Sequence, residues 1–244
     1  MSLPRPAAQT GQRPLKIGLL GGTFNPIHRC HLTVAHNVRQ RLNLDQVLFI
    51  PTGDPPHKLA GGLAPAEDRL AMVRLALEEE SCLTASDLEV RRPGRSYSID
   101  TVTFLQQEWG ATAELYFLIG LDAFLDLSTW RRADDLLTSC HFVVVSRPGA
   151  SFTALCRMEL LPRLDDAALR ALENGRMDSV VFDLPSARRL FLLDIPPCLV
   201  SATLIRERLR HGASLDGLLP AQVESYILRK GLYRESHHLA GFKS

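Results

Sequence analysis

Two histidines three residues apart, His28 and His31, follow a pair of glycines near the start of the chain. Imidazole N–H groups can donate hydrogen bonds to phosphate oxygens, and residues three apart on a helix share one face. Gly21 and Gly22 would let the main chain turn sharply and come close to a ligand. The free amides of a following helix would add partial positive charge. This spacing therefore predicts a site for an anion.

A predicted strand leads into these glycines, and a predicted helix leads away from them. Residues 17–20 form an apolar run that is typical of a buried strand. After His31, apolar side chains at Leu32, Ala35 and Val38 repeat with the period of one helix face. A strand, a tight turn and a helix in this order are a common framework for a phosphate site.

Strands and helices alternate along most of the chain. Strands are predicted at 46–50, within 83–90, and at 114–119, 141–145, 180–183 and 190–194, and helices at 65–79, 99–109, 161–175, 203–211 and 221–230. This alternation indicates right-handed crossovers and a mostly parallel sheet covered on both faces. We therefore expect an α/β fold, a Rossmann-like doubly wound parallel sheet with C-terminal helices.

Four distinctive loops follow predicted strands, at residues 21–28, 55–58, 120–122 and 146–149. Ligands of such sheets bind beyond the carboxyl ends of the strands. Because parallel strands all end at the same edge, we expect the four loops to gather there.

The composition describes an ordinary globular protein. The 244 residues carry a formal net charge of +1, and 45% of them are apolar. This charge gives no electrostatic reason to expect nucleic acid or an anionic membrane as a partner. No apolar run reaches the roughly 20 residues needed to span a bilayer. The positive charge of the anion site must therefore be local.

The cysteines, by their number and spacing, predict reduced thiols in a cytoplasm. They are odd in number, widely scattered and form no CxxC pair: Cys30, Cys82, Cys140, Cys156 and Cys198. This pattern argues against both a disulfide scaffold and a structural zinc site.

No internal repeat or linker divides the chain. We expect a disordered N-terminal tail at 1–15, a single domain at 16–234 and a C-terminal tail at 235–244. An extra segment at about 151–178 has no role that the sequence specifies, and the oligomeric state is equally unspecified.

Two separated motifs resemble the paired signatures of the nucleotidyltransferases. GGTFNPIHRCH at 21–31 resembles the (H/T)xGH signature, and VSATLIR at 200–206 resembles its partner, ISSTxxR. The intervening PPHK, SYSIDT, GLDAF, TW and SRPG make the chain similar to the bacterial nicotinate-nucleotide adenylyltransferases over about residues 16–234. This resemblance implies transfer of the AMP of ATP to nicotinate mononucleotide, which yields deamido-NAD and pyrophosphate in NAD biosynthesis.

The implied reaction needs alignment and charge neutralisation more than a general base, because the attacking phosphate is already an anion. His28 and His31 would donate to phosphate oxygens, and Arg206 would grip the β- and γ-phosphates bidentately. The other residues that the resemblance implies for ATP are Gly21, Gly22, Thr23, Phe24, Cys30, Gly120, Asp122, Ser146, Arg147, Ser201 and Thr203. Mg²⁺ would be held mainly by the ATP phosphates and water, without protein ligands.

For nicotinate mononucleotide the resemblance implies Asn25, His57, Lys58, Tyr97, Ser98 and Trp130. Trp130 would stack on the pyridine ring, and amides at the helix start near Ile99 would receive the carboxylate. Structural alternatives remain for several of them: Trp130 as a core residue, Ser98 or Asp122 as a helix cap, and His57 and Lys58 as solvated side chains.

Three positions depart from the pattern of this family. Cys30 replaces the glycine between the histidines, where its side chain would crowd the adenine and weaken ATP binding. Asn25 stands where Asp is common, and Ala202 replaces the second serine of ISST. Two alternatives stay open: another adenylyltransferase, such as phosphopantetheine adenylyltransferase, and a non-catalytic nucleotide-binding sensor.

Overall fold

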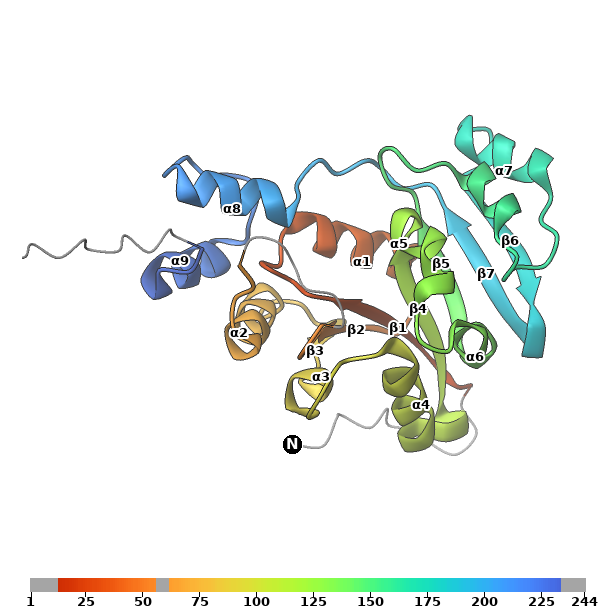
Figure 1. The fold of residues 1–244 in the computed structure, drawn as a ribbon, viewed down its shortest axis with the longest axis horizontal. Coiled ribbons are helices and arrows are strands. Elements are labelled where there is room, and N and C mark those ends of the chain that lie inside the picture. The colour runs from red at the N-terminus through yellow and green to blue at the C-terminus, as the bar shows by residue number, and fades with distance from the viewer. Residues whose placement is uncertain (1–12, 56–61, 234–244) are drawn as a thin grey trace, which may run out of the picture.

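The computed structural model describes residues 13–55 and 62–233, which form one seven-stranded sheet covered by helices on both faces (Figure 1). The strands are β1 (Leu15–Gly22), β2 (Gln46–Pro51), β3 (Leu83–Ala85), β4 (Ala113–Gly120), β5 (His141–Val145), β6 (Ser179–Leu184) and β7 (Arg188–Leu193). Their order in the sheet is β3-β2-β1-β4-β5-β7-β6. All neighbours pair in parallel except β6 and β7, which are antiparallel.

This order makes the fold doubly wound. From β1 the chain builds outward through β2 to β3, and it then returns to the other side of β1 to place β4 and β5. The strand order therefore reverses between β1 and β4, and such a switch point leaves a crevice beyond the carboxyl ends of the two strands.

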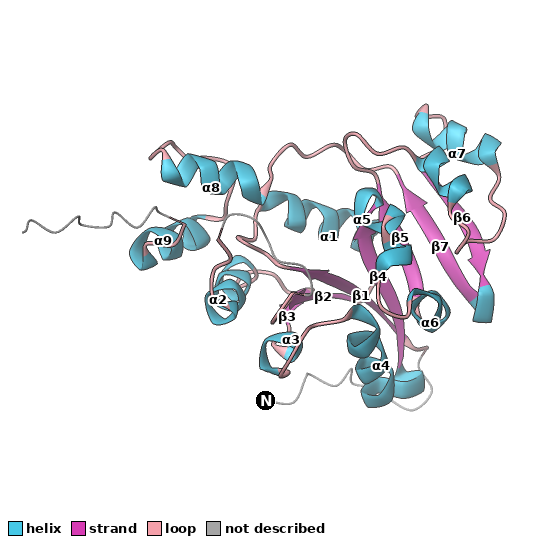
Figure 2. Ribbon diagram, viewed as in Figure 1, coloured by secondary structure: helices cyan, strands magenta, loops and turns pink. Residues whose placement is uncertain are grey.

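The helices pack in two layers (Figure 2). They are α1 (Arg29–Leu42), α2 (Ala66–Ala76), α3 (Leu88–Arg91), α4 (Ser98–Trp109), α5 (Leu121–Leu125), α6 (Ala133–Ser139), α7 (Asp166–Glu173), α8 (Ala202–Arg210) and α9 (Ala221–Lys230). Buried side chains of α1, α2, α8 and α9 form one apolar cluster with the sheet, and those of α4, α5, α6 and α7 form the other. Both faces of the sheet are thereby removed from water, as its continuous apolar strands require.

The predicted fold class is confirmed, with local differences. The 83–90 region divides into the short strand β3 and the single turn α3, and the helices α5 and α6 were not predicted. The reversed direction of β6 follows from its connection to β7, residues 185–187, because parallel strands need a crossover of a dozen or more residues.

Part of the predicted N-terminal tail is folded. Leu15 already belongs to β1, and the Arg13 guanidinium bonds both carboxylate oxygens of Asp45 at 2.9 Å. The folded part of the chain therefore begins before residue 16, since Leu15 already pairs with Ala113 of β4. This corrects the predicted boundary. Residues 1–12 and 234–244 lie outside the described ranges.

The extra segment at about 151–178 covers one end of the sheet. Its buried side chains, Phe152, Leu155, Leu169 and Leu172, join the apolar cluster of α4 to α6. The segment contains a 3₁₀ helix (Phe152–Arg157) and α7, which pack against each other, and α7 also packs on β6. These contacts give the segment a structural role that its sequence alone did not indicate.

Candidate active site

The turn after β1 presents the first signature at the carboxyl edge of the sheet. Gly21 and Gly22 both lie within β1, and neither has a positive φ angle, so the expectation that they make the sharp turn is wrong. Phe24 takes the left-handed conformation instead, at φ 46°. A Cβ added at Gly21 would meet no atom within 4 Å, so glycine here leaves space open beside the turn.

Phe24 packs against the ring of His31. Its ring is buried, with its centroid 5.0 Å from that of His31 and 5.7 Å from that of Phe49. The side chain is thus a core residue, and only the main chain of Phe24 can serve the predicted contact with ATP.

His28 and His31 face each other at the start of α1. His28 is the N-cap residue, one position before the helix, and the two ring centroids lie 3.8 Å apart. The backbone N–H of His28 donates to Nδ1 of His31 at 3.2 Å. Because this Nδ1 acts as an acceptor, the proton of a neutral His31 is on Nε2. The two rings are neighbours, but His28 precedes the helix, so they do not share a helix face as the spacing had predicted.

Burial and positive charge keep both imidazoles neutral at neutral pH. Burial, and after it the charge of Arg147, lowers the pKa of His28 to about 4. Burial, followed by the charges of His28 and Arg147, holds the pKa of His31 well below its ordinary value. Nδ1 of His28 is buried without a hydrogen-bond partner among the described residues. The pair therefore offers polar groups whose partner would come from a ligand.

The second signature meets the first through Arg206. Ser201 is the N-cap of α8, and its hydroxyl accepts a hydrogen bond from Leu204 N. Arg206 Nη1 donates to the carbonyl of Asn25 at 2.8 Å, and Nη2 donates to Thr203 Oγ1 at 3.3 Å. Two of its nitrogens therefore already have protein partners, while Nε is buried without one in the described part of the chain. The bidentate grip predicted for phosphate would require an exchange of these bonds.

Residues after β4 and β5 complete the same edge. Nε of Arg147 lies 3.9 Å from Oδ1 of Asp122. A Cβ at Gly120 would stand 2.6 Å from that carboxylate oxygen and 2.8 Å from Arg147 Nε, so a larger residue here would require both side chains to shift. The Ser146 hydroxyl donates to the carbonyl of Ile195 and accepts from its N–H. Ser146 is thus used to hold the chain after β7, although it was predicted to contact ATP.

The residues predicted for the pyridine ring lie in the layer of helices that contains α4 and pack near β4. They are Tyr97, Trp130 and the first turn of α4. Tyr97 is the N-cap of α4, so Ser98 is the first helical residue and the alternative of Ser98 as the cap is wrong. Trp130 is half-buried, 6.2 Å from the ring of Phe117 and edge-on to it, and is therefore not enclosed in the core. The Arg131 guanidinium stacks over the Tyr97 ring at 4.7 Å, a contact that sequence reasoning missed.

Asn25 and Arg69 hold the loops of the site together. Asn25 Nδ2 donates to Gly62 O, and its Oδ1 accepts from Ala64 N, both at 3.0 Å. The Asn25 amide predicted to bind nicotinate mononucleotide is thus engaged in the protein. The predicted ligands His57 and Lys58 lie outside the described residues.

Arg69, in the first turn of α2, has 0% exposure and was not predicted as part of the site. It donates to the carbonyls of Thr23 at 2.7 Å, Gly53 at 3.0 Å and Ala64 at 3.0 Å. No sequence signal distinguishes this arginine from a solvated one.

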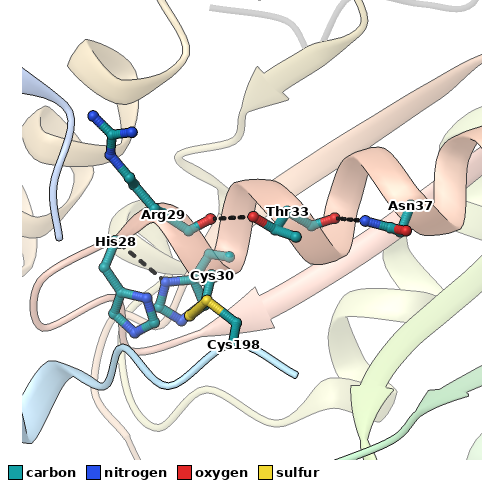
Figure 3. Close-up of a disulfide and its surroundings, with 7 residues drawn as sticks. His28, Arg29, Cys30, Thr33, Asn37 and Cys198 are labelled. Carbon is teal, nitrogen blue, oxygen red and sulfur yellow. Dashed lines mark hydrogen bonds between the residues drawn. A yellow bond between two sulfur atoms is a disulfide. The ribbon is translucent and has the colours of Figure 1, made fainter. Parts of the chain in front are cut away.

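A disulfide joins Cys30 to Cys198, which corrects the prediction that all five cysteines are reduced thiols (Figure 3). The two residues are 168 positions apart, and the fold places their Cα atoms 5.6 Å apart. Such a pairing depends on how α1 and the chain after β7 pack, so cysteine spacing could not reveal it. Cys82, Cys140 and Cys156 are free.

A cavity of about 310 Å³ opens next to this disulfide. Its walls include Thr33 and Val34 of α1, Ser146 and Arg147 after β5, and Cys198. This volume is at the lower end of the range of about 300–1,000 Å³ that small-molecule pockets occupy.

The cytidylyltransferase-like family matches residues 19–208, a range that contains both signatures. A probable nicotinate-nucleotide adenylyltransferase of Pelobacter propionicus is 43% identical over 226 residues, which cover 91% of this chain and 99% of the relative. The chain belongs to the nicotinate-nucleotide adenylyltransferase family. A Synechococcus member of this family is 42% identical over 89% of this chain and 94% of its own.

Solved structures of the nicotinate-nucleotide adenylyltransferase family share the fold. The Plasmodium falciparum nicotinic acid mononucleotide adenylyltransferase complexed with NaAD superimposes with a TM-score of 0.67 at 17% identity. The match covers 90% of this chain and 97% of the other. At this identity the likeness supports the architecture alone.

The described residues contain no helix long and apolar enough to cross a membrane. Within the same residues, no three His, Cys, Asp or Glu side chains converge in a way that could hold a metal ion.

Proposed function

We propose that the chain transfers the adenylyl group of ATP to nicotinate mononucleotide, within one nucleotidyltransferase domain that begins before residue 16 and includes all of β1. The observation that carries this proposal is the meeting of the two signatures. His28, His31, Arg147 and Arg206 come from three distant parts of the sequence and gather at the carboxyl edge of β1, β4 and β5. Imidazole and guanidinium donors in one crevice suit a polyphosphate.

In the proposed reaction, a phosphate oxygen of nicotinate mononucleotide attacks the α-phosphorus of ATP. A bond forms between this oxygen and the phosphorus, and the bond from the phosphorus to the β-phosphate oxygen breaks, releasing pyrophosphate. No proton must be removed from the nucleophile, so the histidines act as donors. Nε2–H of His31 would stabilise charge on the α-phosphoryl oxygens, and Arg206 and Arg147 would hold the departing phosphates.

Mg²⁺ would bind through ATP oxygens and water and supply additional neutralisation of the phosphate charge. The histidines and arginines at this edge present N–H groups, and the one carboxylate described there, Asp122, faces Arg147, so a metal that arrives on the nucleotide fits the edge better than one with protein ligands. The use of ATP also leads us to propose that the enzyme works in the cytoplasm.

The pyridine part of the second substrate would lie between Trp130 and the start of α4. The N–H groups of Ser98 and Ile99, in the first turn, bond to no described residue and could receive the nicotinate carboxylate. Arg131, over the Tyr97 ring, brings a positive charge beside them, which also lies 4.0 Å from the Asp100 carboxylate in the same turn. A neutral amide would gain less from both, which predicts selectivity for nicotinate over nicotinamide mononucleotide.

The test is pyrophosphate release from ATP with three acceptors compared side by side: nicotinate mononucleotide, nicotinamide mononucleotide and phosphopantetheine. We expect kcat/KM for the nicotinate form to exceed that for the nicotinamide form by about tenfold or more, with no release above background from phosphopantetheine. Preference for phosphopantetheine would contradict the proposed function. ATP binding without transfer to any acceptor would instead favour a nucleotide sensor.

A further inference from the structure

The disulfide lies between the two signatures. Cys30 is the second residue of α1, placed between His28 and His31, and Cys198 stands three residues before the N-cap Ser201 of α8. Figure 3 shows the disulfide at the start of α1, where it joins Cys30 of the helix to Cys198 of a separate stretch of chain. One covalent bond therefore connects the helix of the histidines to the chain that leads to Arg206.

Residues 194–201, here called the β7–α8 segment, are also tied to the far end of α1, where Arg41 Nη1 donates to the carbonyl of Asp194 at 2.6 Å. Ile195 is bonded to Ser146, at the beginning of the segment. Pro196 and Pro197 have no N–H group, and the side chain of Leu199 is 82% exposed. The disulfide is thus the main connection between the middle of this segment and the first turn of α1.

Cys198 also forms part of the wall of the 310 Å³ cavity, together with Arg147 and with Thr33 of α1. The position of the β7–α8 segment therefore decides how open this cavity is. Arg147, one of the donors proposed to hold ATP, lines this cavity together with Cys198, so a nucleotide that reaches Arg147 there would meet the disulfide.

We propose that the Cys30–Cys198 pair is a reversible thiol modification site that controls ATP binding. The disulfide holds the β7–α8 segment against the first turn of α1 and weakens ATP binding, and its reduction frees the segment and restores binding. This inference rests on the proposed function, because it places ATP between the two signatures. Intracellular disulfides are commonly transient or redox-sensing, which agrees with such a role in the proposed compartment.

The reductant is a dithiol. Cys198 is partly exposed, whereas Cys30 is 1% exposed, so a thiolate of the dithiol attacks Sγ of Cys198. The protein S–S bond breaks as a mixed disulfide forms, and the electron pair leaves on Cys30 sulfur, where the first turn of α1 stabilises a thiolate. The second thiol of the reductant then closes its own disulfide and releases Cys198. Two electrons and two protons pass from the dithiol to the two cysteines.

The experiment compares the full-length protein in two states, after oxidised glutathione and after reduced dithiothreitol, each followed by removal of the reagent. Mass spectrometry of unreduced peptides establishes the linkage. We expect the oxidised state to show a KM for ATP about tenfold higher, with kcat and the KM for nicotinate mononucleotide within about twofold. Renewed reduction should reverse the change. A disulfide that only stabilises the fold would not separate the two KM values in this way.

Two variants make the test specific. Cys198→Ser should show the low KM for ATP under both treatments, and Cys198→Ala serves if the serine variant is poorly folded by circular dichroism. Cys156→Ser, at an exposed free cysteine, should keep the full response. Failure to find the Cys30–Cys198 linkage in the oxidised protein would overturn the proposal, as would an equal or lower KM for ATP in that state.

Equilibrium binding of ATP, measured by calorimetry on both states, separates this inference from the proposed function. If neither state transfers adenylyl groups but oxidation weakens ATP binding by about tenfold, the proposed reaction fails and the thiol site stands. Equal affinities in the two states would refute the thiol site whatever reaction the protein catalyses.

Discussion

A neutral histidine has a single N–H, so its value at a phosphate site depends on which nitrogen carries the proton. In this chain the backbone N–H of His28 donates a hydrogen bond to Nδ1 of His31, so the proton of the neutral ring is on Nε2. The ring is further held by its contacts with Phe24 and His28. Donor direction at His31 is therefore set before a ligand binds, which is what stabilisation of a transition state by a fixed dipole requires.

Loss of this donor should slow catalysis more than it weakens binding. We expect His31→Ala to lower kcat by about 100-fold or more, with a smaller change in the KM for ATP, in the pyrophosphate-release assay. His36→Ala, at an exposed position on the same helix, is the matched control and should retain normal turnover. Near-normal kcat in the His31 variant would remove the assigned role.

Burial of His28, at 5% exposure, should also make stability depend on pH. Its folded pKa of about 4 lies below the ordinary 6.5, so the unfolded chain binds more protons between these values. Stability from this group is complete above pH 6.5 and falls as the pH drops toward 4, by about 3 kcal/mol in total. Urea unfolding from pH 7 to 4 should show a shallower decline for His28→Gln than for the unmodified protein. Parallel curves would contradict the prediction.

At the scale of elements, the site depends on side chains that never face the ligand. The turn after β1, the loop after β2 and the start of α2 come together because Arg69 donates to a carbonyl in each. Asn25 adds two bonds between the first signature and residues 62–64. Buried carbonyls are costly without donors, so these contacts set the relative positions of the loops.

Replacing Arg69 should therefore damage stability and substrate binding together. Arg69→Met leaves the carbonyls of Thr23, Gly53 and Ala64 without this donor, and we expect a loss of roughly 3 kcal/mol in the free energy of unfolding. The KM values of both substrates should rise. Arg74→Met, on the exposed side of α2, should change neither quantity appreciably, and equal behaviour of the two variants would disprove the positioning role.

The whole molecule rests on two apolar clusters with the sheet between them. Phe142 on β5 is fully buried, with ring centroids 5.5 Å from Phe117 and 5.4 Å from Phe124. Such packing surrounds the strands whose ends carry the site, so the stability of the sheet and the geometry of the loops are linked.

Shortening a buried side chain inside the sheet should lower the free energy of unfolding far more than shortening an exposed side chain on its edge strand. Phe142→Ala is expected to lower the free energy of unfolding by about 3–5 kcal/mol. Val181→Ala, at a side chain that is 48% exposed on the edge strand β6, should change it by less than about 0.5 kcal/mol. Urea denaturation of both variants measures the difference, and comparable losses would show that the edge contributes as much as the centre.

Local sequence patterns predicted most of the strands and helices, and also the first signature. Apolar runs placed the long strands within one or two residues, since a strand buried on both faces is apolar throughout. The short helices α5 and α6 escaped detection because five to seven residues contain too few turns to show a period. The antiparallel direction of β6 depends on the short connection at residues 185–187. The sequence could not show this, because the strands on both sides of the connection are only weakly indicated.

By itself, the sequence determined the strand, turn and helix around His28 and His31, because apolar periodicity along a short stretch of chain decides which local structure it forms. Tertiary structure alone decided which distant groups meet them. It brought Arg206 to the carbonyl of Asn25, buried Arg69 among three loops and joined Cys30 to Cys198. Each of these contacts depends on the order of strands in the sheet, which residue spacing along the chain does not encode.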